Sequence, residues 1–155
     1  MKKIICLLLC LTTVFVSASA QSHKMPKYDI TGAGSGNEGT VLVKVFIYEK
    51  KADDQQLKCA AVHGIVFRGV TGNNSGAKQP PMAPATAELD NATFCSEFFT
   101  PDGQCQNFAS IVDGSYERVK TSKGYKNGAI VQINKSELRK YLEKAGLVRS
   151  LSSGF

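Results

Sequence analysis

The segment GTVLVKVFIYEKKADDQQLKCAAVHGIVFRG, residues 39–69, contains the clearest change of hydrophobic period in the chain. In its first part every second residue is a β-branched apolar one: Val41, Val43, Val45 and Ile47. These residues share one face of an extended strand, and Leu42 and Phe46 make the opposite face nearly as apolar. Because both faces are largely apolar, we predict an interior strand of a covered sheet at residues 41–49.

The second part of the segment has the period of a helix. Asp53 or Asp54 is a suitable N-cap, and Gly69 is a natural stop. Small and apolar residues follow the cap at three- and four-residue spacing: Leu57, Ala60, Ala61, Gly64 and Ile65. A face built from such small residues predicts a helix that lies close against another element.

The remaining pattern predicts an α+β fold. A second, less regular helix is expected at Thr86–Phe99, and a hairpin at Tyr116–Ser122 and Gly128–Ile133. A final helix begins at Asn134, with Glu137 in capping-box position. The expected architecture is a small sheet, made of the central strand and the C-terminal hairpin, packed by about three helices.

A glycine cluster precedes the first strand and raises the question of a phosphate site. Its members are Gly32, Gly34, Gly36 and Gly39. Phosphate-binding loops place their glycines after a strand and at the start of a helix, so that helix N-terminal amides point at the anion. Here the order is reversed. We therefore interpret residues 21–38 as a flexible leader and a glycine-rich loop.

The first twenty residues read as a signal peptide. Lys2 and Lys3 precede an apolar run, and Ala18-Ser19-Ala20 fits a small-x-small cleavage site. The apolar run is too short and wrongly flanked for a membrane span. We expect an exported protein, periplasmic or extracellular, without a transmembrane segment in the mature chain.

The mature chain is expected to hold one domain, residues 39–151, with a long loop at residues 69–85 that is rich in Gly, Asn and Pro. Residues 21–155 carry 17 basic and 13 acidic side chains, a net charge of +4. The basic residues are spread along the sequence, whereas a nucleic-acid footprint requires a dense stripe with interleaved aromatics. We expect no nucleic-acid partner.

Three cysteines follow the cleavage site: Cys59, Cys95 and Cys105. In an oxidising compartment, Cys95 and Cys105 are close enough in sequence to close a small disulfide loop. That pairing leaves Cys59 either buried and inert or free to react.

Cys59 and His63 are four residues apart on the predicted helix and share a face, as a nucleophile and its base would. No motif marks an orienting group or an oxyanion pocket. The two residues could also join Cys95 and Cys105 in a Cys₃His zinc set, but the spacing matches no compact zinc site. The acidic residues read as helix caps and solvated charges. We expect no metal, no cofactor and no catalytic residue.

Two features are candidates for partner binding. The phenylalanine cluster Phe94, Phe98, Phe99 and Phe108 is either core or an apolar docking patch. The loop 69–85 is either a segment that binds a partner or a surface loop without such a role. A carbohydrate-binding module is a further possibility, and it would require exposed aromatics on the sheet, for which Tyr48, Tyr116 and Tyr125 are the candidates.

Residues 39–69 are similar to small secreted proteins of Bacteroidetes-type bacteria, and their strand-then-helix layout resembles the domain of LPP20-type envelope lipoproteins. The lipid-attached cysteine of those lipoproteins is missing here. The resemblance implies an accessory role in the envelope and supplies no catalytic residue. The resulting hypothesis is a non-enzymatic envelope protein that acts through protein–protein contacts. The alternative is a thiol-dependent enzyme or redox protein centred on Cys59 and His63.

Overall fold

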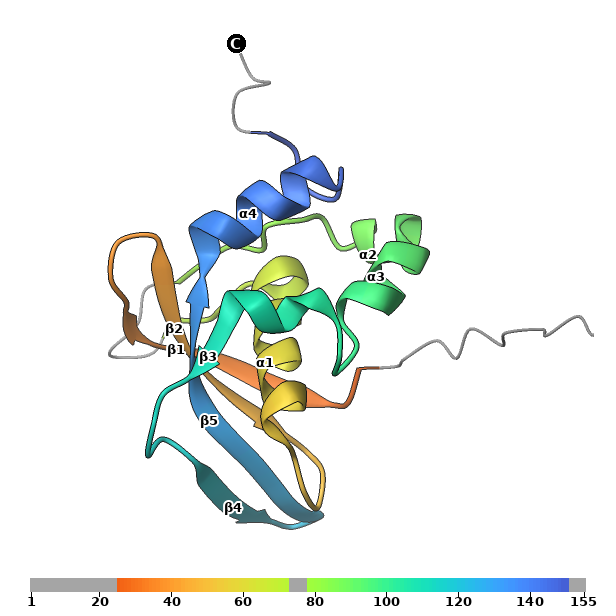
Figure 1. Ribbon diagram of the computed structural model, residues 1–155. Helices are drawn as coiled ribbons and strands as arrows, with labels where there is room; N and C mark the ends of the chain where they lie inside the picture. Colours follow the sequence, from red (N-terminus) through yellow and green to blue (C-terminus); the bar gives the residue numbers. More distant parts are fainter. Residues whose placement is uncertain (1–24, 73–77, 151–155) are drawn as a thin grey trace, which may run out of the picture.

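The computed structural model describes residues 25–72 and 78–150 (Figure 1). The predicted signal peptide at residues 1–20 lies outside these ranges. The described residues form an α+β fold around a five-stranded antiparallel sheet, as the sequence predicts. The elements follow the order β1–β2–α1–η2–α2–α3–η3–β3–β4–β5–α4, where η2 and η3 are short π- and 3₁₀-helical turns.

Strand β5 (Gly124–Asn134) organises the sheet. One of its edges pairs with β2 (Thr40–Ile47), and the other pairs with β3 (Ala109–Ile111) and β4 (Glu117–Thr121). The other edge of β2 pairs with β1 (Tyr28–Ser35). Strand β2 therefore has a neighbour on each side, which confirms the predicted central strand, and β4 with β5 confirms the predicted hairpin.

Strand β1 corrects the prediction for residues 21–38, because Tyr28–Ser35 is a strand and not a leader or loop. Backbone pairing needs no side chain, so the glycines take part in it, with a bulge between Gly32 and Gly34. The outer edge of β1 is partly covered, since the Gly32 amide donates to the Thr71 carbonyl at 3.1 Å. The folded unit consequently begins before Gly39.

Helix α1 (Asp54–His63) packs on the sheet face that holds the core. Asp53 is its N-cap, one of the two caps that the sequence predicts, and it forms a capping box with Gln56. Ala60 and Ala61 are fully buried, and such short side chains let the helix approach the strands closely. The facing strand residues are also buried: Val43, Val45, Ile47, Ala129, Val131 and Ile133.

The turn η2 (Gly64–Arg68) continues α1 and crosses close to β1. A Cβ atom on Gly64 would lie 2.7 Å from Ile30 Cδ1 and 3.2 Å from Tyr28 Cε2. Only glycine allows this approach without a shift of its neighbours. The contact brings the side chain of Tyr28 beside the end of α1.

The predicted second helix is broken into α2 (Ala87–Asp90) and α3 (Ala92–Phe98). The break lies at Asn91, whose backbone leaves the helical region at φ −122° and ψ 38°. The 3₁₀ turn η3 (Gln104–Phe108) follows and leads into β3. Helix α2 reaches the end of α1, where Glu88 lies 3.0 Å from His63.

The loop predicted at residues 69–85 holds no helix or strand in its described parts, 69–72 and 78–85. It is nevertheless attached at both ends. Val70 and Gln79 exchange backbone hydrogen bonds of 2.8 and 3.0 Å, and the Ala83 amide donates to the Val66 carbonyl at 2.9 Å. Val70 and Ala83 are buried, so these ends belong to the core.

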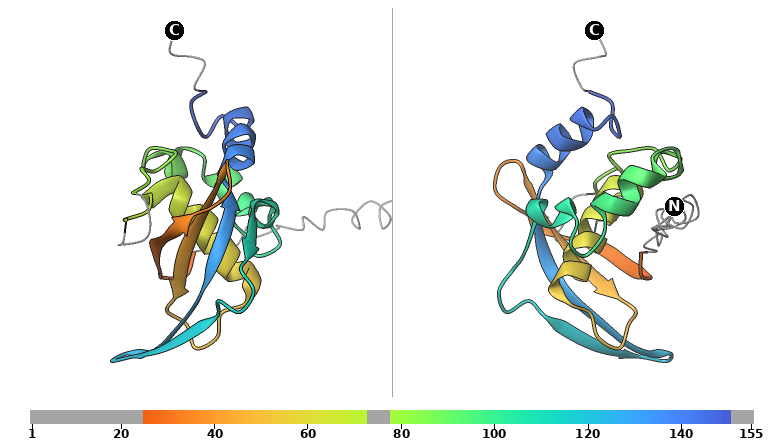
Figure 2. Two further views of the ribbon diagram at one scale, coloured as in Figure 1. Left: turned by 90° about the vertical axis from the view of Figure 1, so that its left-hand side faces the viewer. Right: turned by 45° about the vertical axis from the view of Figure 1, so that its right-hand side comes forward.

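Helix α4 (Lys135–Lys144) follows β5 directly, and Asn134 caps it through the Glu137 amide. Leu138 and Leu142 bury its apolar side. Figure 1 shows α4 at one end of the molecule and the tip of the β4–β5 hairpin at the other. The views in Figure 2 show the hairpin extending beyond the helices.

Candidate functional site

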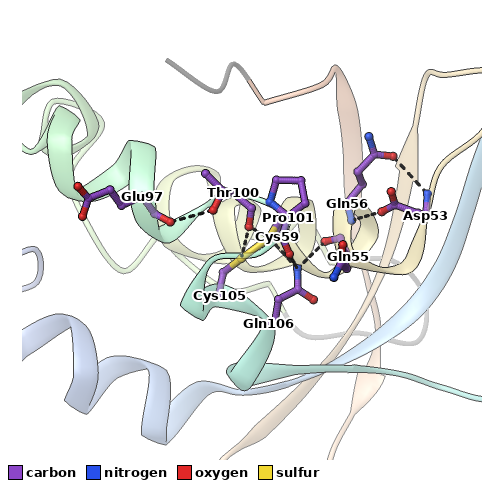
Figure 3. The surroundings of a disulfide bond; sticks show 9 residues. All are labelled: Asp53, Gln55, Gln56, Cys59, Glu97, Thr100, Pro101, Cys105 and Gln106. Atoms are coloured by element: carbon purple, nitrogen blue, oxygen red, sulfur yellow. Dashed lines mark hydrogen bonds between the residues drawn. A yellow bond between two sulfur atoms is a disulfide. The ribbon is translucent and has the colours of Figure 1, made fainter. Parts of the chain in front are cut away.

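The disulfide joins Cys59 of α1 to Cys105 of η3, so the predicted Cys95–Cys105 pairing is wrong (Figure 3). The two partners are 46 residues apart in sequence, and tertiary packing brings their Cα atoms to 5.7 Å. Short sequence spacing favoured Cys95, but α3 directs that residue elsewhere. The side-chain amide of Gln106 fixes the region by donating to the carbonyls of Gln55 and Pro101 at 3.0 and 2.8 Å.

This pairing removes the basis for a nucleophile at Cys59, because a disulfide sulfur is not a thiolate. It also removes two members of the Cys₃His set considered for zinc. Within residues 25–72 and 78–150, no group of three His, Cys, Asp or Glu side chains is arranged to hold a metal ion.

Cys95 is the free cysteine among the described residues, and it is buried. Burial, and to a smaller degree the negative charge of Glu88, raises the pKa of its thiol to about 11. The thiol is therefore protonated at neutral pH, and the protonated form is a poor nucleophile. Cys95 does not replace Cys59 as a catalytic candidate.

His63 is buried at the end of α1, with 4% of its surface exposed, and both ring nitrogens have partners. Nδ1 lies 2.7 Å from the Tyr28 hydroxyl, and Nε2 lies 3.0 Å from a Glu88 carboxylate oxygen. A carboxylate only accepts, so Nε2 carries the proton and Nδ1 accepts from the Tyr28 hydroxyl. The chain of hydrogen bonds thus links β1, α1 and α2.

Burial is the main influence on the pKa values of His63 and Tyr28. It lowers the pKa of His63, although the hydrogen bond and negative charge of Glu88 partly oppose the effect. It also raises the pKa of Tyr28 above the ordinary phenol value. Phe67 and Phe99 complete the surroundings, each with a ring centroid 5.0 Å from that of His63. His63 and Tyr28 are therefore neutral and structurally paired at physiological pH.

Arg68 covers the other side of Tyr28. Its guanidinium carbon lies 4.1 Å from the centre of the Tyr28 ring, and its Nη1 donates to the Tyr28 carbonyl at 3.2 Å. The stacking is a cation–π contact, and the hydrogen bond satisfies a carbonyl on the outer edge of β1. The side chain of Arg68 is held in place while its residue remains exposed.

A cavity of about 640 Å³ lies beside this cluster. Its walls are mostly apolar, and Arg68 and Glu88 contribute one charge of each sign. Leu89, on α2, is 81% exposed, although leucine is usually buried. The main apolar contributors are Phe67, Leu89, Ala92 and Phe99. The volume lies within the range of about 300–1,000 Å³ usual for ligand pockets.

The phenylalanine cluster is largely buried. Phe98 and Phe99 are each only 3% exposed, so these two rings do not form an exposed apolar patch. Phe94 and Phe108 are half-buried and pack with Tyr141 of α4. The cluster joins α3, η3 and α4 as core.

The three tyrosines considered for carbohydrate binding are exposed. Tyr48 lies on the strand face of Lys126, and Tyr125, the residue before Lys126, points to the opposite face. Tyr48 donates to Asp29 of β1, and Tyr116 donates to Asp54 at 2.6 Å. Tyr125 lies on the hairpin, under the guanidinium of Arg118. They make no common platform for a sugar ring.

Sequence reasoning placed His63 on the correct helix face but missed its partners. Tyr28 lies in the segment that the sequence predicts to be a leader, and Glu88 is one acidic residue among several. The local signal that was available is Gly64, whose missing side chain indicates a close approach of another element. Nothing in the sequence identifies that element as β1.

No family model matches the chain, and no curated protein or solved structure shows significant similarity to it. Among the described residues, no helix has the length and apolar character needed to cross a membrane.

Proposed function

We propose that this chain is an exported, non-enzymatic accessory protein of a bacterial envelope, which acts by binding a partner protein. The resemblance of residues 39–69 to envelope proteins supports the location. The Cys59–Cys105 disulfide supports it as well, because disulfides persist in oxidising compartments.

The cavity beside α1, α2 and α3 is the observation that carries the binding role. It offers apolar walls, whereas the cysteine and the histidine in its lining are unsuited to catalysis. Burial keeps the Cys95 thiol protonated and His63 neutral, and both nitrogens of His63 are already engaged. To act as a general base, His63 would need a free nitrogen within reach of a substrate proton.

An apolar side chain of a partner protein fits this site best. Leu89 presents an exposed apolar group beside Phe67 and Phe99, the arrangement expected of a protein contact. Arg68 and Glu88 supply opposite charges, which orient a peptide segment by its polar groups. The partner would thus insert an aliphatic or aromatic anchor and bond its flanking polar groups to the two charged residues.

The substitution Ala92→Trp tests the proposal by filling the cavity from an exposed position of α3. Ala145→Trp is the matched control, because Ala145 is also exposed and does not line the cavity. The protein and both variants, purified from the envelope of the native host after crosslinking, are compared by mass spectrometry. We expect one partner with the unmodified chain and Ala145→Trp, and its loss with Ala92→Trp.

A fluorescent apolar dye, anilinonaphthalene sulfonate, provides an independent measurement on the purified chain. Its fluorescence should rise with the unmodified protein and Ala145→Trp, and much less with Ala92→Trp. Equal partner capture and equal dye binding by all three proteins would exclude the cavity as the binding site. Turnover of a substrate that depends on His63 would contradict the non-enzymatic assignment.

A further inference from the structure

The β4–β5 hairpin carries a concentration of positive charge. The twelve residues Glu117–Gly128 carry four basic side chains and one acidic one, a net charge of +3. Residues 21–155 together carry a net charge of +4, from 17 basic and 13 acidic side chains. Most of the excess charge is therefore located on one projecting element.

These four cations are not neutralised within the described protein. Arg118, Lys120 and Lys123 are exposed, and Lys126 is half-buried. The described residues include all 13 acidic side chains of the sequence, and none of them forms an ion pair with these four. Glu117, the acidic residue of the hairpin, pairs with Lys44 at 2.5 Å.

Strand register distributes the charges around the hairpin. On β4, Lys120 lies opposite Tyr125, and Arg118 lies opposite Asn127. On β5, Lys126 lies opposite Val119, and this pair is on the other face of the hairpin. Because successive side chains point to opposite faces, the two faces both carry cations, and Lys123 lies in the turn. Figure 2 shows this end of the hairpin projecting past the helices, so a flat surface can reach it.

Aromatic rings support two of the cations. The Arg118 guanidinium carbon lies 4.1 Å from the centre of the Tyr125 ring, and Lys126 Nζ lies 4.3 Å from that of Phe46. Tyr48 also lies within 5.9 Å of Lys126 Nζ. Tyr48 and Tyr125 are 38% and 42% exposed. Tyrosine is enriched at the headgroup level of membranes. Clustered lysine and arginine side chains are attracted to anionic lipids.

We propose that the β4–β5 hairpin binds the surface of a bilayer that contains anionic phospholipids. The cations contact the headgroup phosphates, and Tyr48 and Tyr125 lie at the interface. The turn Ser122–Gly124 has no large apolar residue, so the contact is electrostatic and reversible, without insertion into the hydrocarbon. A nucleic acid offers phosphates too, but the disulfide indicates an oxidising compartment, where a membrane surface is the available polyanion.

This surface is independent of the proposed cavity. The hairpin lies near the start of α1, where Tyr116 bonds to Asp54, and the cavity lies at the end of α1, at His63. A ten-residue helix separates them by about 15 Å. The protein could therefore contact a membrane and a partner protein at the same time, and either activity can fail without the other.

Co-sedimentation of the mature chain with vesicles tests the inference. One set contains phosphatidylcholine alone, and the other contains phosphatidylcholine and phosphatidylglycerol in equal amounts. The test variant is Arg118→Gln, Lys120→Gln and Lys123→Gln combined. The matched control removes the same kinds of charge from exposed positions at or after α4. It combines Lys140→Gln, Lys144→Gln and Arg149→Gln.

We expect the unmodified chain to bind only the anionic vesicles and to dissociate as salt rises. The hairpin variant should bind roughly 100-fold more weakly, at about fivefold for each lost cation, and the control variant should bind within about threefold of the original. Thermal unfolding and circular dichroism verify that both variants remain folded.

Failure of the unmodified chain to bind anionic vesicles would overturn the inference. An equal loss in both variants would also overturn it, because net charge alone would then explain the binding. A DNA duplex at the same phosphate concentration is the third arm. Tighter binding to that duplex than to the vesicles, with the same loss in the hairpin variant, would replace the lipid surface by a nucleic acid.

Discussion

Tyr28 and His63 are 35 residues apart in the sequence and share a hydrogen bond of 2.7 Å in the core. The bond joins the edge strand β1 to the end of α1, and His63 extends the connection to Glu88 of α2 at 3.0 Å. Three elements that are distant in sequence are thereby held around the cavity. The stability of this arrangement can be tested residue by residue.

Removing the Tyr28 hydroxyl should destabilise the fold. Tyr28→Phe leaves the buried Nδ1 of His63 without a donor, at an expected loss of about 1–3 kcal/mol in the free energy of unfolding. Urea denaturation measures the change. Tyr125→Phe, at an exposed position without a hydroxyl contact, should alter stability by less than about 0.5 kcal/mol. Equal stability of Tyr28→Phe and the unmodified chain would show that the bond contributes nothing.

The stability should fall as the pH drops below the ordinary histidine pKa of 6.5. Burial lowers the pKa of His63 in the folded state, so the unfolded chain binds more protons in this range. The contribution of neutral His63 is fully present above pH 6.5, and it is lost as the pH falls toward the lowered pKa of the folded state. Nuclear magnetic resonance titration of the imidazole should place that pKa below 6.5.

Glu88→Gln should extend this pH dependence. The negative charge of Glu88 opposes the effect of burial on His63, so its removal should lower the pKa of His63 further. A glutamine oxygen can still accept from Nε2, which preserves the hydrogen bond. The decline of stability should then continue to lower pH than in the unmodified protein. An unchanged or raised pKa of His63 in this variant would refute the assigned role of Glu88.

Peptide mapping without reduction should recover Cys59 linked to Cys105, with Cys95 as a thiol that is alkylated quickly only after unfolding. Cys59→Ala with Cys105→Ala should lower stability by roughly 4 kcal/mol, the chain-entropy value for a 46-residue separation. Rapid alkylation of native Cys59 would restore the thiol alternative. A Cys95–Cys105 peptide would support the pairing that sequence spacing suggests.

A methyl group at Gly64 should lower the free energy of unfolding, because β1 lies so close to this residue. Gly64→Ala places Cβ 2.7 Å from Ile30 Cδ1, and an overpacked contact of this kind costs about 1–3 kcal/mol. Ile30→Val removes that methyl group, so the double variant should recover part of the loss. Unfolding of both single variants and the double variant measures the coupling. Additive effects would indicate that the two residues do not touch.

Much of the secondary structure could be predicted from local patterns. The alternation of Val41, Val43 and Val45 identified the strand, because one buried face places an apolar residue at every second position. The opposite face of β2 is only half-buried, so the sheet is not covered on both faces as the sequence predicts. The caps at Asp53 and Asn134 identified two helix starts, because each cap acts within three residues of its own position. Strand β1 escaped notice because its backbone forms the sheet, while its glycines resemble a loop.

The α+β class, the central strand and the helix starts follow from local patterns, since these features depend on neighbours in the chain. The pairing of Cys59 with Cys105, and the positions of Tyr28 and Glu88 beside His63, depend instead on tertiary packing. Tertiary packing also decided that the hairpin formed by β4 and β5 projects beyond the helices. The physical reason is that a disulfide, a buried hydrogen bond and a charged surface depend on distance in space, and packing sets that distance independently of separation along the chain.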